Sequence, residues 1–199
     1  NISGTASISS GTYNETGSVG GTFTASGGTV TTTGAVTGLF TASGAGIANT
    51  GALNGGLTVS GSTVTTTGAI TGPVTASSGT VNGTGAITGN VTVSGATVNG
   101  LGNVTGDLNL TTGQLNPTAA AQMCTISGAV TLGAGFVIDF NTTAKDYAVS
   151  NNFITCASLT GTCIIKLNGT TMPSYSLSYG SGGIKLVVPS AGLSLEQAQ

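Results

Sequence analysis

The sequence predicts an all-β protein: a parallel β-solenoid (β-helix) with 17-residue coils, followed by a less regular β-rich C-terminal capping module. The first supporting observation is a Gly-x-apolar-x-Gly pattern that recurs every 17 residues without an insertion. The second is composition, because 35 of 199 residues are Gly and only 4% are charged. Gly and β-branched residues dominate and no 3.6-residue period appears, which argues against helices. The pattern begins at Gly17, Gly34, Gly51, Gly68, Gly85 and Gly102.

Each repeat places apolar residues at its third, seventh, ninth and fourteenth positions, counted from the first Gly. In the repeat that starts at Gly34 these residues are Val36, Phe40, Ala42 and Ile47. Between the third and ninth positions, apolar residues or Gly alternate with Thr or Ser, which is typical of a strand with one buried face. So short a unit cannot bury that face alone, so the copies are expected to stack. Roughly seven coils at the spacing of paired strands would make a rod about 34 Å long.

The N-terminal segment follows the same frame. Ile2, Ala6, Ile8 and Tyr13 fall on the third, seventh, ninth and fourteenth positions of a partial coil. Residues 1–118 are therefore predicted to form the solenoid. The glycines at the first and fifth positions are expected at its corners, since Gly tolerates a positive φ.

Residues 119–199 are predicted to form the C-terminal module, which continues or caps the solenoid. The repeat fades after Leu115, and Asn116-Pro117 breaks the pattern. A helical turn is expected over residues 119–123, and the terminal units of solenoids are commonly atypical. Strands are expected at 129–132, 136–140, 152–156, 163–167, 175–179 and 184–188.

Two segments of this module resemble known exported proteins. The stretch from Gly128 to Gly133, after Gly/Thr/Ser-rich coils, is similar to the β-helical passengers of bacterial autotransporters and to autotransporter-associated β-strand repeats. The segment from Met172 to Tyr179, followed by Ile184 to Val188, resembles the ends of such regions, where a Pro-x-aromatic strand pairs with a final apolar strand. The resemblance implies an exported fibrous fold and no particular activity.

The sequence offers little chemistry, and we expect no catalytic, cofactor-binding or metal-binding residues and no enzymatic activity. Glu15 and Asp107 are the only carboxylates of the repeat region and belong to distant coils. Asp139 and Asp146 are closer together, but we interpret them as solvated turn charges. The sequence contains no His and no Arg, so it lacks the side chains that most acid–base catalysts and nucleic-acid-binding proteins use. The calcium-binding nonapeptide of β-rolls needs Asp in every turn, and the cysteines lack zinc-site partners.

The three cysteines allow one disulfide. Cys156 and Cys163 flank residues 157–162, which we interpret as a hairpin loop, so we predict a disulfide between them in an oxidising compartment. The alternative is three buried thiols. Cys124 would be free or would pair between subunits.

A regular surface pattern accompanies the strands. At the eighth and tenth positions Thr and Ser flank an inward-pointing residue, so their side chains are expected to form two parallel hydroxyl ladders. Threonine ladders on β-solenoids resemble those of ice-binding proteins, although here Ser fills the second rank. The alternatives are that these are ordinary polar strand residues of an uncharged solenoid, or a lateral contact face between rods. The predicted ladder is Thr24, Ser26, Thr41, Ser43, Thr58, Ser60, Thr75, Ser77, Thr92 and Ser94.

The expected function is structural. A net charge of −2 and a hydrophobic fraction of 38% favour assembly over disorder. Natural proteins protect edge strands with charge, Pro or a cap, and the segment from Asn1 to Gly11 has none of these. We therefore expect the N-terminal coil to dock on a C-terminal surface of another copy by strand addition. The expected contact residues are Ile2, Ala6, Ile8 and Tyr13 of the N-terminal coil and Val187, Leu193 and Leu195 of the C-terminal surface. Heterologous contacts that do not close build filaments.

The chain is therefore expected to be a subunit of an extracellular bacterial filament or surface layer whose only partner is itself. The alternative function is a monomeric adhesin or ice-binding module that uses the Thr/Ser ladder. A chain that starts at Asn1 without Met suggests a processed, secreted protein at the cell surface, and no stretch is apolar enough for a membrane span.

Overall fold

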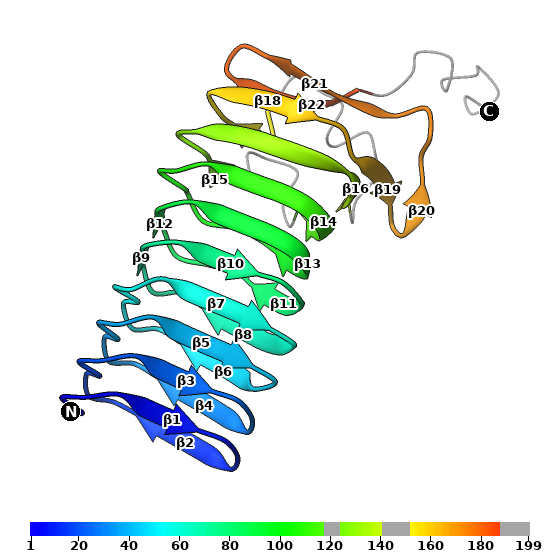
Figure 1. The fold of residues 1–199 in the computed structure, drawn as a ribbon. Helices are drawn as coiled ribbons and strands as arrows, with labels where there is room; N and C mark the ends of the chain where they lie inside the picture. The colour runs from blue at the N-terminus through cyan, green and yellow to red at the C-terminus, as the bar shows by residue number, and fades with distance from the viewer. Residues whose placement is uncertain (118–123, 141–151, 188–199) are drawn as a thin grey trace, which may run out of the picture.

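The computed structural model describes residues 1–117, 124–140 and 152–187, and within them every regular element is a β-strand. The chain winds into a parallel β-solenoid of about seven stacked coils, which confirms the predicted fold class (Figure 1). Equivalent residues of successive coils pair in exact steps of one repeat, as with Ala6 and Phe23, then Phe23 and Phe40. No helix among these residues is long and apolar enough to cross a membrane.

Each coil contributes a strand or a bridge to three faces, which we call A, B and C. Face A is the narrowest; it begins with bridges from Ile2 upward and continues as β9 (Ile70–Thr71), β12 (Ile87–Thr88), β15 (Cys124–Thr125) and β17 (Ile154–Thr155). Face B carries the seventh to ninth positions: β1 (Ala6–Ile8), β3 (Phe23–Ala25), β5 (Phe40–Ser43), β7 (Leu57–Ser60), β10 (Val74–Ala76) and β18 (Ser158–Gly161). Face C carries the fourteenth: β2 (Thr12–Glu15), β4 (Thr29–Thr32), β6 (Gly46–Asn49), β8 (Ser62–Thr66), β11 (Gly79–Asn82) and β19 (Ile164–Leu167).

Three long strands run through the corner between faces B and C and join the two faces into one sheet. They are β13 (Val91–Asn99), β14 (Leu108–Asn116) and β16 (Ala129–Phe140). The β13–β14 and β14–β16 pairs change register at this corner, as a bulge does. Their first halves continue face B, and their second halves continue face C.

The core consists of the predicted apolar columns. Phe23 and Phe40 are fully buried and stack with ring centroids 4.8 Å apart, the spacing of paired strands. The other columns are buried too, and Val30, Val36 and Val59 are each at most 1% exposed. Stacking is therefore what buries an apolar face that one coil exposes.

Glycine is required at the first position for a different reason from the one expected. None of the six, from Gly17 to Gly102, has a positive φ. A Cβ on Gly51 would instead collide with the carbonyl of Gly34 in the preceding coil, and Gly68 meets Gly51 in the same way. Close backbone approach between coils therefore excludes a side chain here. Positive φ does occur at the corner between faces B and C, as at Gly28, Gly44 and Gly61.

The C-terminal module lengthens the coils and then closes two of the three faces with antiparallel strands. Thr131 and Thr160, which are hydrogen-bonded on face B, are 29 residues apart in sequence. On face A, β22 (Gly183–Val187) pairs antiparallel with β17, and β21 (Ser176–Gly180) pairs with β22. On face C, β20 (Thr170–Thr171) pairs antiparallel with β19. The module thus both continues and caps the solenoid.

Both antiparallel hairpins turn through two residues with positive φ. Asn168 and Gly169 join β19 to β20, and Ser181 and Gly182 join β21 to β22. Such two-residue turns match the twist of antiparallel strands. The Asn-Gly dipeptide is therefore a local hairpin signal within this module.

Candidate interaction surfaces at the two ends

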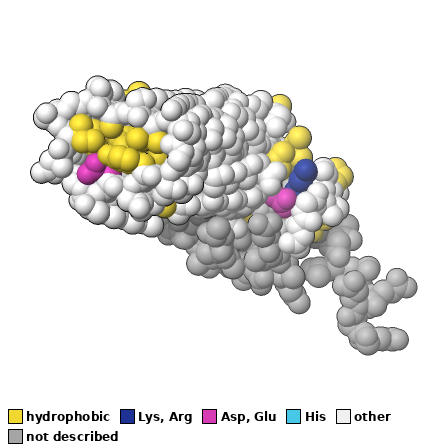
Figure 2. Space-filling view, turned by 90° about the horizontal axis from the view of Figure 1, so that it is seen from below, with side chains coloured by type: hydrophobic (Ala, Val, Ile, Leu, Met, Phe, Trp, Pro, Cys, Tyr) yellow, Lys and Arg dark blue, Asp and Glu magenta, His cyan; other side chains and the backbone are white. Residues whose placement is uncertain are grey.

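Among the residues that the structure describes, no strand pairs with the lower edge of the first coil. Strands β1 and β2 each pair only with the strand above them, and the Ile2 bridge likewise has a partner only above. Their inward side chains are half-buried, whereas the equivalent residues of the next coil, such as Phe23 and Val30, are fully buried. Seen from below, these side chains form an apolar patch with acidic atoms at its border (Figure 2). The patch consists of the four predicted interface residues Ile2, Ala6, Ile8 and Tyr13.

Glu15 lies beside this patch and is fixed by two hydrogen bonds. Its carboxylate accepts from the Tyr13 hydroxyl at 2.6 Å and from the Gly17 amide at 2.7 Å. These contacts, the Tyr13 hydroxyl first, hold the pKa of Glu15 below its usual value. The Tyr13 pKa is raised by the same hydrogen bond. The open end therefore combines apolar side chains with one fixed negative charge.

The C-terminal end differs, because two of its last three strands are already covered. β17 is paired by β22 and β19 by β20, whereas β18 pairs only with β16 below it. Among the described residues, β18 is therefore the one strand of the last coil with a free outer edge. The Tyr179 hydroxyl of the cap donates to the Ala157 carbonyl just before β18.

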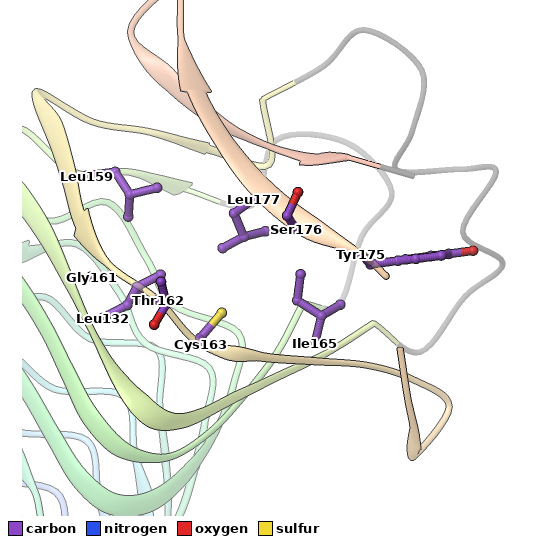
Figure 3. Close-up of a pocket in the computed structure, with 9 residues that line it drawn as sticks. All are labelled: Leu132, Leu159, Gly161, Thr162, Cys163, Ile165, Tyr175, Ser176 and Leu177. Atoms are coloured by element: carbon purple, nitrogen blue, oxygen red, sulfur yellow. The ribbon is translucent and has the colours of Figure 1, made fainter. Parts of the chain in front are cut away.

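A groove of about 240 Å³ opens beside β18 (Figure 3). Leu132 and Leu159 line it from face B, Ile165 from β19, and Leu177 from the cap strand β21. In Figure 3 the Cys163 sulfur and Leu177 point toward the groove, whereas the Tyr175 ring points away. The lining is mainly apolar and contains no charged side chain.

The predicted C-terminal interface residues are described only in part. Val187 ends β22 and is 41% exposed. Leu193 and Leu195 lie outside the described residues, as do Asp146 and the helical turn expected at 119–123. The apolar residues beside the outer edge of β18 are therefore the better defined surface at this end, although no repeat pattern in the sequence predicts them.

The predicted Thr/Ser ladder forms in register. Thr41, Thr58, Thr75 and Thr92 are directly opposed on successive strands of face B. Part of the serine rank is used internally, however. The Ser26 hydroxyl donates to the Ile8 carbonyl at 3.4 Å and the Ser77 hydroxyl to Val59 at 3.3 Å. The ladder is thus partly a structural contact between coils.

Two further polar columns were not predicted. Inside the corner between faces C and A, the Thr32 hydroxyl donates to Asn49, whose amide donates to Thr66 at 2.9 Å. All three side chains are at most 2% exposed. The column occupies the sixteenth position of three successive repeats, where Thr and Asn resemble ordinary surface residues.

The second column is an asparagine ladder on the outside of face C. Asn99 donates its amide to Asn82 at 2.8 Å, and Asn116 donates to Asn99 at 2.6 Å. The same 17-residue spacing that stacks apolar residues stacks these amides. A polar repeat position that keeps the same amide in successive coils is the signal that could have revealed it.

The predicted disulfide between Cys156 and Cys163 is wrong for this structure, in which all three cysteines are free thiols. The segment between them is not a hairpin loop, because Ser158–Gly161 forms β18 and pairs parallel with β16. An extended four-residue strand separates two Cα atoms by more than the about 7 Å that a disulfide can span.

The thiols are poorly ionised. Burial raises the pKa of Cys163 to about 11, and burial together with nearby Cys156 raises that of Cys124 to about 12. Burial also raises the Cys156 pKa. These groups are unsuited to nucleophilic chemistry at neutral pH.

The described carboxylates have structural partners. Asp107 accepts from the Ala129 amide of the next coil at 2.8 Å, and Asp139 accepts from the Gly169 amide at 3.0 Å. Asp139 is buried and holds the β19–β20 turn, which differs from the solvated charge that we expected. Within the described ranges, no group of three His, Cys, Asp or Glu side chains could hold a metal ion.

No protein-family model matches the chain, and no curated protein or solved structure is significantly similar to it.

Proposed function

We propose that this chain is a structural subunit of an extracellular filament or surface layer, and that copies join head to tail through the ends of the solenoid. The observation that carries the proposal is the free lower edge of the first coil. Here Ile2, Ala6 and Ile8 continue columns that are fully buried one coil above. An apolar strand edge without a partner is a template for another chain.

Backbone groups at this edge support the proposal. In the second coil, the amides of Gly20, Ser26 and Thr29 donate to carbonyls of the coil below. The equivalent groups of the first coil belong to Ser3, Ser9 and Thr12, and no described residue lies below them to accept. An added strand would satisfy these donors in the geometry that the solenoid already uses.

The weak charge of the chain supports the same conclusion. Three basic and five acidic residues in 199 leave little repulsion between copies. The exported, cell-surface setting is part of the same proposal and is supported by the resemblance to autotransporter passengers.

Electron microscopy of the purified chain over a range of concentrations tests the proposal. We expect unbranched fibres whose length grows with concentration, and Ile8→Lys should abolish them because it places a charge in the apolar patch. Leu39→Lys is the matched control, since Leu39 is 37% exposed on the third coil and therefore lies two coils above the apolar patch. Discrete short rods at every concentration, or equal loss of fibres in both variants, would refute the proposal.

A second candidate is an adhesin or ice-binding module that acts as a monomer. The in-register threonine column of face B favours it. This function predicts a soluble rod, and replacing Thr58 and Thr75 by Tyr should abolish binding to ice or to a carbohydrate surface without unfolding the protein.

A further inference from the structure

We propose that the free edge of β18 and the groove beside it receive strand β1 of a second copy of this chain. The inference rests on the proposed function and deepens it, because it names the receiving strand, the register and the anchoring side chain. The contact is the addition of one strand on face B, rather than the stacking of a whole coil.

The covered strands of the last coil determine which face can accept a partner. On face A, the layer above β17 is occupied by β22, and on face C the layer above β19 is occupied by β20. Within the described ranges, only face B ends with a strand, β18, whose outer edge has no pairing strand, and the same face begins with β1, which pairs only with the strand above it. The two free edges therefore belong to one interrupted column.

The backbone groups of these two edges are complementary. On face B, the seventh-position amide of each coil donates to the sixth-position carbonyl of the next coil, as Phe23 does to Leu39 at 3.0 Å and Val74 to Asn90 at 2.9 Å. Leu159 holds the seventh position in β18, so its amide faces the free edge. The matching acceptor in the first coil of a second copy is the carbonyl of Thr5.

The side chains then fall into a defined register. Val130 pairs with Leu159 and Leu132 with Gly161, so the column that starts at Ala6 ends at Leu159 and the column that starts at Ile8 ends at Gly161. Gly161 has no side chain, so this column is hollow above Leu132, where the groove lies. Ile8 of the second copy would occupy that space.

The charges of the two ends also match. Glu15 is the charged side chain of the described N-terminal coil, whereas Lys166 and Lys185 lie on β19 and β22 at the other end. Figure 2 shows acidic atoms beside the apolar patch, and basic atoms with acidic atoms next to them at the far end. A head-to-tail contact brings opposite charges together, but a contact between two N-terminal ends would bring two copies of Glu15 together.

The geometry also limits the strength and shape of the contact. A three-residue strand with one apolar anchor buries far less than the roughly 1,200 Å² of a stable interface, so single contacts should be weak and assembly should need high concentration. Because β22 and β20 occupy the layer that the other two faces of an incoming coil would need, the axes of successive subunits cannot be collinear.

Disulfide trapping between two variants, each with one added cysteine, tests the register. The outward residues that would be directly opposed are Ser7 of β1 and Thr160 of β18, both exposed. Protein with Ser7→Cys is mixed with protein carrying Thr160→Cys and oxidised, and we expect a covalent dimer on a non-reducing gel. The native thiols compete poorly, because burial raises the pKa of Cys163 to about 11 and that of Cys124 to about 12.

Controls separate this register from unspecific oxidation. Neither variant alone should form the dimer, and Asn14→Cys, exposed on face C of the same first coil, should not cross-link to Thr160→Cys. Ile8→Lys placed in the Ser7→Cys protein should reduce the dimer at least tenfold, whereas Leu39→Lys should not change it.

The outcomes distinguish the two proposals. Fibres with no Ser7–Thr160 dimer would overturn the β18 site and leave the structural function standing. A specific dimer without fibres would support the β18 site and refute the filament. If neither fibres nor the dimer formed, both proposals would be refuted.

Discussion

The repeat region and the C-terminal module solve the same packing problem in opposite ways. In the repeat region every coil is buried by a copy of itself, so Phe23 meets Phe40 and Thr41 meets Thr58. In the C-terminal module the neighbours are unlike, and Phe140 packs edge-on against Phe153 at 5.3 Å. The last coil is then covered by strands of the opposite direction.

This difference shows why one end can be closed and the other open. A parallel coil always leaves its outer edge available to an identical coil, so repetition alone cannot end the stack. Antiparallel hairpins end it because their strands use the free hydrogen-bonding groups of β17 and β19. No antiparallel strand covers the first coil within the described part of the chain, and Glu15 lies at the border of that coil.

The largest expected effect comes from a substitution that disrupts the stacking of coils in the repeat region. In Gly55→Ala the new Cβ would collide with the backbone of Gly38 and Leu39 in the preceding coil. Because backbone atoms cannot move aside cheaply, we expect a loss of more than about 4 kcal/mol in the free energy of unfolding or failure to fold. Denaturant unfolding followed by circular dichroism measures it.

Gly4→Ala is the matched control, since Gly4 holds the same repeat position in the first coil and has no atom within 4 Å of its Cβ position. Its unfolding midpoint should stay that of the parent chain. Equal destabilisation by both substitutions would mean that close approach between coils is not what the glycine serves.

A smaller effect tests the buried polar column. Asn49→Ala removes the partner of the Thr32 hydroxyl and of Thr66 in a fully buried corner, so we expect a loss of about 1–3 kcal/mol in the free energy of unfolding. Asn99→Ala removes the equivalent kind of contact from the half-exposed ladder and should cost less, about 0.5–1.5 kcal/mol, because water replaces it. A larger loss for Asn99→Ala in thermal unfolding would contradict this ranking.

The smallest effect concerns the open end. The folded-state pKa of Glu15 is lowered, first by the Tyr13 hydroxyl and then by the Gly17 amide. A lowered folded pKa contributes stability that is present above the unfolded-state pKa and is lost as pH falls through the folded value. Below neutral pH the melting temperature should therefore decline slightly in the acid range, and Glu15→Gln should remove that component.

The control for this pH dependence is Tyr13→Phe, which keeps the ring and deletes the hydroxyl that donates to Glu15. It should weaken the acid-range decline without removing it, because the Gly17 amide still donates. A pH profile that is identical in the parent chain and in Glu15→Gln would show that Glu15 does not contribute.

The sequence by itself determined the solenoid, its 17-residue coil and the inward columns, because identical spacing puts identical side chains on top of one another. It also placed the half-buried residues of the first coil, Ile2, Ala6 and Ile8, and the threonine ladder. All of these follow from one local period and one strand alternation.

Only the tertiary structure decided the features that depend on non-repeating contacts. Between Cys156 and Cys163 the chain forms strand β18 rather than the expected hairpin loop. Strands β22 and β20 pair antiparallel with β17 and β19, and a groove lies beside β18. The tertiary structure also showed that the first-position glycines serve close approach rather than positive φ. The physical reason is that periodicity specifies which residues share a column, whereas the partner of a strand that breaks the period depends on the space and the free hydrogen bonds left by the rest of the fold.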